Sequence, residues 1–169
     1  MVVQGQYCDS DLMSNAAEIS FSSVAVSAAN VSFNGYRMAQ NWIGDENTAG
    51  SVACCWKPSA STTNEWIMAD LGEVKTITGS DTQGGKNGMW VTSYKLSYSI
   101  NGREFKTYKN RATGNDKVFE VNHNEDGVFY TKLNPRINAR FIKLHPQSWS
   151  TDIGLRWRLR GCSSNHHFQ

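Results

Sequence analysis

The side chains best suited to catalysis in this sequence are its histidines and its loop carboxylates. The histidines are His123, His145, His166 and His167. None of them stands in an H-E-x-x-H pattern, and neither a G-x-S-x-G nor a P-loop pattern occurs. A loop acid such as Asp81 could join a carboxylate pair of the kind that hydrolyses glycosidic bonds, but we interpret these acids as solvated. The sequence therefore predicts a protein without catalytic activity.

Metal and phosphate sites have weaker support. Oxygen ligands suited to calcium occur at Asp45, Glu46, Asn47 and Asp81. They lack the spacing of an EF-hand, so a structural calcium ion is a secondary expectation, and no other cofactor is expected. The stretch "GGKNG" (84–88) precedes a strand pattern and lacks the G-K-[ST] ending of a phosphate-binding loop.

Large apolar side chains stand in stretches that otherwise have the composition of exposed loops. Met89 and Trp90 follow the glycine-rich stretch 83–88, and Trp42 stands within "QNWIGDEN" (40–47). We expect Trp90 to cap the core where a strand begins, and Met89, one residue nearer the loop tip, to be exposed. Apolar side chains gathered at one end would form a patch with a polar rim, which is typical of recognition sites.

The segments that must position these loops alternate as β-strands do. In "YKLSYSI" (94–100) one face carries Tyr94, Leu96, Tyr98 and Ile100. Similar patterns run from 66 until they break at Gly72, and from 141 until they stop at Pro146. Polar, glycine-containing loops separate the strands at 28–36, 44–53, 57–64, 83–88, 109–117 and 145–152. Short strands joined by such loops predict an all-β antiparallel sandwich or barrel.

Composition and the last strand pattern argue against nucleic acid as a partner. The net charge is only +2. In "LRWRLRGC" (155–162), alternation puts Trp157 on the face opposite Arg156, Arg158 and Arg160. Trp157 is therefore predicted to be a core residue rather than part of a basic, aromatic stripe.

The length of 169 residues suits one domain. We expect it to span 8–162, between an N-terminal tail at 1–7 and a C-terminal tail at 163–169. The start "MVVQGQYC" lacks the long apolar core of a signal peptide, and no run of 18 apolar residues could span a membrane.

The four cysteines fall near the two ends and in one adjacent pair. A bridge between Cys8 and Cys162 would close a loop of roughly 150 residues and stabilise the fold by about 4–5 kcal/mol. Such a bridge needs an oxidising compartment, which indicates a location outside the cell. We favour buried or free thiols at Cys54 and Cys55 over a strained bridge between these neighbours.

Five stretches, in order along the chain, resemble the discoidin family, also called the coagulation-factor type C domain. They are "NEWIMADLGEVKTITG", "DTQGG", "MWVTSYKLSYSINGREFKTY", "INARFIKLHPQSW" and "IGLRWRLRGC". The resemblance implies an eight-stranded antiparallel jelly-roll barrel, galactose-binding-domain-like, with a Cys8–Cys162 bridge at one end. It also implies ligand-binding loops at the opposite end, near 24–35, 38–53, 83–89 and 110–116. The sequence departs from the family pattern at Ser80, at Met68-Ala69, at Val121 and at Arg158, where an acid is usual.

The resemblance and the loop residues together predict an extracellular adhesion module that binds glycans or glycoproteins. The candidate ligand-binding residues are Asn34, Tyr36, Arg37, Trp42, Lys86, Asn87, Met89, Trp90, Asn115 and Asp116. Aromatic rings can stack on sugars, and amide, carboxylate and guanidinium groups can hydrogen-bond to them. The alternative is an anionic phospholipid membrane met by Arg37, Lys86 and Lys117. The sequon at Asn30, if glycosylated, would hinder membrane insertion of its loop.

Overall fold

The structure is a computed structural model, and it describes residues 7–13, 18–23, 55–85 and 87–164. Within these ranges the chain forms eight strands: β1 (Ser10–Asp11), β2 (Glu18–Phe21), β3 (Ile67–Gly84), β4 (Trp90–Ser99), β5 (Lys106–Thr107), β6 (Phe119–Glu120), β7 (Phe129–Ser150) and β8 (Leu155–Ser163). Every pairing between them is antiparallel, which confirms the predicted fold class. None of the described residues belongs to a helix long and apolar enough to cross a membrane.

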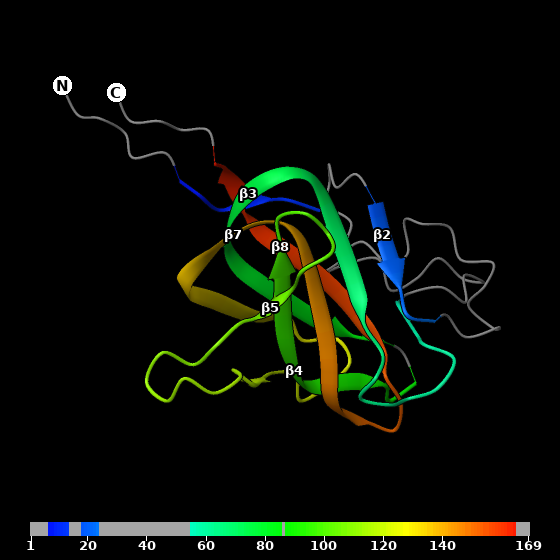
Figure 1. The fold of residues 1–169 in the computed structure, drawn as a ribbon. Helices are drawn as coiled ribbons and strands as arrows, with labels where there is room; N and C mark the ends of the chain where they lie inside the picture. Colours follow the sequence, from blue (N-terminus) through cyan, green and yellow to red (C-terminus); the bar gives the residue numbers. More distant parts are fainter. Residues whose placement is uncertain (1–6, 14–17, 24–54, 86, 165–169) are drawn as a thin grey trace, which may run out of the picture.

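Two long, bent strands connect the layers of the sandwich (Figure 1). β3 and β7 form one antiparallel ladder, whose register shifts between Asp70 and Lys75, where Gly72 has a φ of 82°. Such bulges bend a strand, so its two halves can belong to different layers. On one side of the bend β3 pairs with β2, and on the other side it pairs with β8. β4 pairs with the second half of β7 and carries β5 and β6.

The core confirms most of the predicted alternation. On β8 the side chains of Leu155, Trp157 and Leu159 are at most 1% exposed, and those of Tyr94 and Leu96 on β4 are fully buried. The apolar face of each strand therefore points between the layers, and burial of this kind is the main source of stability.

Ser80, one of the departures from the family pattern, lies inside this core. Its Oγ accepts hydrogen bonds from the Tyr94 hydroxyl and from Trp157 Nε1, both at 3.0 Å. Burial also raises the pKa of Tyr94 to about 12. An aliphatic residue at position 80 would leave these two buried donors without this acceptor.

Two details of the predicted strands are wrong. β7 does not stop at Pro146 but runs on to Ser150, so most of the predicted loop 145–152 is strand. Pro146 lacks an N–H donor, and the β4–β7 register is irregular beside it, between Ser93 and Tyr94. Ile100 does not continue the buried face of β4, because the strand ends at Ser99; its side chain is 67% exposed.

A disulfide joins Cys8 to Cys162, with the two Cα atoms 4.7 Å apart. It fixes the chain before β1 to the end of β8, so both ends of the described barrel lie on the same side of the molecule (Figure 1). Cys55 is buried. Cys54 lies outside the described residues, so the state of this adjacent pair stays a prediction.

Candidate functional site

The 83–89 loop connects β3 to β4 and is closed by its own backbone. The Gly85 N–H donates to the carbonyl of Met89 at 2.8 Å. At the tip, Asn87 and Gly88 have positive φ angles of 63° and 75°. Asparagine tolerates this left-handed conformation better than most residues, and glycine adopts it freely. The result is a tight loop that exposes the Asn87 side chain.

A second loop, residues 122–127, braces the first. The Gly88 N–H donates to Glu125 Oε2 at 2.8 Å. Arg156 of β8 is only 5% exposed and links both loops. Its Nε–H donates to the Gly84 carbonyl at 2.8 Å, and its Nη2 donates to the Glu125 carbonyl at 3.1 Å. A buried cation thus holds two surface loops in one geometry.

Met89 and Trp90 are both half-buried at the base of this loop. A Cβ placed on Gly154 would lie 2.9 Å from Met89 Cβ, and one placed on Gly84 would lie 2.7 Å from Trp90 Cβ. Neighbouring backbone therefore packs against the root of each side chain. Met89 is less exposed than predicted for this reason. Trp90, predicted to cap the core, is half-buried and is not among the side chains that pack against the core cluster.

Several predicted site residues lie outside the part of the chain that the structure describes. The candidate ligand-binding residues among them are Asn34, Tyr36, Arg37, Trp42 and Lys86. The same holds for Asn30 of the sequon and for the possible calcium ligands Asp45, Glu46 and Asn47. Predictions about these residues stay predictions.

The interpretation of Asp81 as a solvated loop acid is wrong. Asp81 lies within β3 and is fully buried. Its Oδ2 accepts from Arg158 Nη2 at 2.9 Å and from Arg160 Nε at 2.7 Å, and its Oδ1 accepts from Arg160 Nη2 at 3.1 Å. We call Asp81, Arg158 and Arg160 the buried charge centre. Because both carboxylate oxygens are engaged, Asp81 is not available as a calcium ligand.

Asn115 and Asp116 lie on a different loop, beside the middle of β4. Asp116 accepts from Lys95 at 3.2 Å and also pairs with Lys109, and we call these three residues the exposed charge centre. The hydrogen bond from Lys109, followed by that from Lys95, lowers the pKa of Asp116. Since Lys95 stands five residues along β4 from Trp90, about 16 Å along the strand, the structure does not bring this pair to the 83–89 loop.

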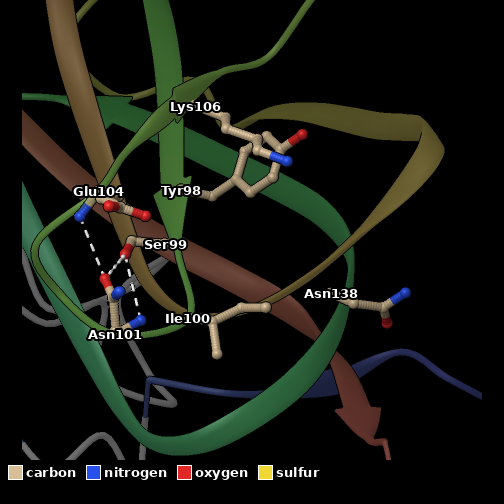
Figure 2. Close-up of a pocket in the computed structure, with 7 residues that line it drawn as sticks. All are labelled: Tyr98, Ser99, Ile100, Asn101, Glu104, Lys106 and Asn138. Carbon is tan, nitrogen blue, oxygen red and sulfur yellow. Dashed lines mark hydrogen bonds between the residues drawn. The ribbon is translucent and has the colours of Figure 1, made fainter.

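The sequence reasoning missed a hollow of about 500 Å³ beside the turn between β4 and β5 (Figure 2). We call it the β4–β5 hollow, and it is lined by Tyr98, Ser99, Ile100, Asn101, Glu104, Lys106 and Asn138. An isoleucine directly before an Asn-Gly turn was the available signal, because an apolar residue in a turn has no strand face on which to be buried. The contribution of Asn138 could not be found in this way, since it comes from the bend of β7.

Comparison with known proteins identifies the family. The family model described as "F5/8 type C domain" matches residues 18–159. Coagulation factor V of Bos taurus is 39% identical over 119 residues, which cover 69% of this chain and 5% of the relative. Neuropilin-1 of Xenopus laevis is 31% identical over 161 residues, which cover 92% of this chain and 16% of the relative. The chain therefore spans only a small part of these relatives.

Solved structures agree with the fold. Discoidin II of Dictyostelium discoideum superposes with a TM-score of 0.72 at 25% identity, covering 89% of this chain and 57% of that chain. CpGH89CBM32-5 of Clostridium perfringens, in complex with GalNAc-β-1,3-galactose, superposes with a TM-score of 0.56 at 19% identity, covering 91% of this chain and all of that chain (100%). The match over most of the length, the jelly-roll topology and the Cys8–Cys162 bridge lead to one conclusion: the chain belongs to the F5/8 type C, or discoidin, domain family.

Proposed function

We propose that this chain is a non-catalytic module that binds glycans or glycoproteins through the 83–89 loop and the neighbouring predicted loops, outside the cell and in cell adhesion. The observation that carries the proposal is the bracing of the 83–89 loop by the buried Arg156. A loop fixed before binding loses little conformational entropy when a ligand arrives, which favours recognition.

The side chains around this loop suit a sugar. Asn87 is exposed and offers both an amide donor and an amide acceptor, while Met89 and Trp90 offer partly exposed apolar surface. The other proposed contacts are Asn34, Tyr36, Arg37, Trp42 and Lys86. Asn115 and Asp116 lie too far along β4 to contact a ligand held by this loop and are left out of the proposal. The fold is compatible with this role, since CpGH89CBM32-5 holds a disaccharide. The Cys8–Cys162 bridge supports an oxidising, extracellular compartment.

A glycan array with the Asn87→Gly variant tests the proposal. Glycine keeps the positive φ of this position but removes the amide. We expect half-saturation of the best glycan to need about tenfold more protein, equivalent to about 1.4 kcal/mol, with an unchanged melting temperature. Arg136→Ala, an exposed change on β7, is the matched control and should bind as the parent does. An array on which the parent binds no glycan would contradict the proposal.

Anionic phospholipid is the second candidate, and one observation favours it. A hollow of about 420 Å³ beside the 109–117 loop has no acid among its lining residues, and its cationic ones are Lys109, Arg111, Lys117 and Lys132. Such a cluster attracts anionic headgroups. Sedimentation with phosphatidylserine vesicles, but not with phosphatidylcholine vesicles, that weakens in high salt would support this candidate over a glycan ligand.

A further inference from the structure

The β4–β5 hollow lies far from the 83–89 loop. Tyr98, its first lining residue, stands eight residues along β4 from Trp90, which is about 26 Å along the strand. The hollow opens between the turn after β4 and the bend of β7, on the side of the barrel where the disulfide lies (Figures 1 and 2). A ligand held there would not touch the 83–89 loop.

The turn that forms one wall of the hollow is rigid. Ser99 Oγ accepts from the N–H of Gly102 at 2.9 Å and donates to Asn101 Oδ1 at 3.1 Å. Asn101 Oδ1 also accepts from the N–H groups of Arg103 and Glu104, at 2.9 and 3.1 Å. Figure 2 shows the part of this network that joins Ser99, Asn101 and Glu104. The wall is therefore formed before any ligand arrives, which lowers the entropy lost on binding.

The residues that line the hollow carry polar groups for which no protein partner is recorded among the described residues. Asn138 Oδ1 accepts from Thr76 Oγ1 at 2.8 Å, which leaves the Asn138 amide NH₂ to donate. The Asn101 amide NH₂ is also left to donate, since the hydrogen bonds of the turn use only the Asn101 oxygen. Among the described residues, no ion pair engages the Glu104 carboxylate or the Lys106 ammonium group. The hollow thus offers three donor groups and one strong acceptor.

Apolar surface lies beside these polar groups. Tyr98 is half-buried, and Ile100 is 67% exposed. The ring and the aliphatic side chain give a flat apolar wall, against which the C–H face of a sugar ring can pack. Figure 2 shows both side chains among the polar ones.

The chemistry of the lining selects a ligand class. One acid and one base cancel, so the hollow favours neither an anion nor a cation. Glu104 is the single carboxylate in the lining, which is too few ligands for a metal ion. A neutral, polyhydroxylated ligand fits the mixed donors, the acceptor and the apolar wall. A volume of about 500 Å³ lies within the range of small-molecule sites.

We infer that the β4–β5 hollow is a second saccharide site, at the end of the barrel opposite the 83–89 loop. The inference rests on the proposed glycan-binding function for its ligand class, but it depends on separate residues. With sites at both ends, one module can bridge two glycan-bearing surfaces, and avidity follows without any contact between protein molecules.

Amide resonance mapping by NMR tests the two sites separately. The labelled chain is titrated with galactose, with glucose and with GalNAc-β-1,3-galactose. We expect shifts at residues 98–106 and at Asn138, and about fivefold weaker binding there in Ile100→Ala, whose exposed side chain can be shortened without opening the core. Val118→Ala, at an apolar side chain that is 38% exposed, is the matched control and should leave the shifts unchanged.

The two hypotheses fail in different ways in this experiment. Shifts confined to residues 87–90 would overturn the second site and leave the proposed function standing. Shifts confined to the β4–β5 hollow and lost in Ile100→Ala would support the second site and contradict the role of the 83–89 loop. If none of the three saccharides shifts amide resonances at residues 87–90 or at the β4–β5 hollow, the second site is overturned.

Discussion

The buried and the exposed charge centres each place one carboxylate between two cations, but their surroundings differ. In the buried charge centre, Arg160 also pairs with the exposed Asp9. Asp81 has no exposed surface, and its arginine partners are about one-fifth exposed, at 19% and 20%. Asp116 is 36% exposed, and its partners Lys95 and Lys109 are 31% and 56% exposed. Arginines that donate in a fixed fork hold the first acid, whereas flexible lysines hold the second.

The difference teaches that burial, rather than the number of ion pairs, decides what such a cluster does. At Asp81 water cannot replace a lost partner, so removing one member of the cluster leaves buried charge uncompensated at the β3–β8 interface. At Asp116 water screens each pair and can replace it. The buried charge centre is therefore part of the scaffold, and the exposed charge centre is surface that other molecules can reach.

The largest expected effect comes from breaking the buried charge centre. Asp81→Ala removes the buried carboxylate that Arg158 and Arg160 share, while Arg160 keeps its pair with the exposed Asp9. We expect the free energy of unfolding at pH 7 to fall by about 3 to 5 kcal/mol, as for other buried pairs that lose one partner. Urea denaturation followed by tryptophan fluorescence measures this change.

Asp116→Ala is the matched control for that experiment, since it removes the acid of the exposed charge centre. The free energy of unfolding of this variant should be close to that of the parent. If both variants lost the same free energy of unfolding, burial would not distinguish the two charge centres.

A smaller effect is expected at Arg156, which shares a strand face with Arg158 and Arg160. Arg156 donates to two backbone carbonyls, and its only acidic partner among the described residues is the exposed Asp126, at the limiting distance of 4.0 Å. Arg156→Met keeps much of the side-chain volume and removes both donors. We expect a loss of about 3 kcal/mol in the free energy of unfolding, which is the low end of the sum for two hydrogen bonds that contribute about 1.5–3 kcal/mol each. Amide hydrogen exchange should rise at Gly88 and in the 122–127 loop, and unchanged exchange there would contradict the bracing role.

Much of the scaffold could be predicted from the sequence, because alternation along a strand is a local property. The burial of Leu155, Trp157 and Leu159 on one strand face was predictable from their spacing alone. The Cys8–Cys162 disulfide was predictable from the family resemblance. The burial of Asp81 could not be predicted in this way. It depends on the pairing of Asp81 with Arg158, 77 residues away, and that register exists only in the folded sheet.

The binding regions were harder to predict for a similar reason. The β4–β5 hollow needs Asn138 from the bend of β7, and the bend depends on a register shift rather than on a residue pattern. The 83–89 loop was recognisable from its glycines, but its bracing depends on Arg156 and on the 122–127 loop, which are distant in the sequence. Sites assembled from separate strands leave little local signal.

A pH dependence links the exposed charge centre to its neighbour His145. Burial, followed by the charges of Lys143 and Lys95, lowers the pKa of His145 from 6.5 to about 4. In the unfolded chain His145 takes up a proton near pH 6.5, but in the folded chain it stays neutral until about pH 4. The unfolded state therefore binds more protons in this window, and stability falls as the pH falls through it.

Melting temperatures between pH 7 and pH 4 measure this dependence. His145→Gln should flatten the slope, since glutamine can keep a hydrogen bond to Ser97 Oγ, which lies 2.7 Å from His145 Nε2. His123→Gln, at an exposed position, is the matched control and should keep the parent slope. A parent slope that survives in His145→Gln would assign the dependence to other groups.

The smallest effect is expected from Asp116→Asn, which neutralises the exposed acid while keeping its shape. The lysine hydrogen bonds lower the pKa of Asp116 from its ordinary value of 3.8, so its contribution is present above that pH and fades as the pH falls through the lowered pKa. At pH 7 we expect the free energy of unfolding to change by no more than the error between repeated urea denaturation curves. In 1 M salt the change should be smaller still. A more sensitive readout is His145, because Lys95 loses the acid that offsets its charge, so the His145 pKa measured by NMR should fall further. A large loss of stability with no movement of the His145 pKa would show that Asp116 belongs to the scaffold, as Asp81 does.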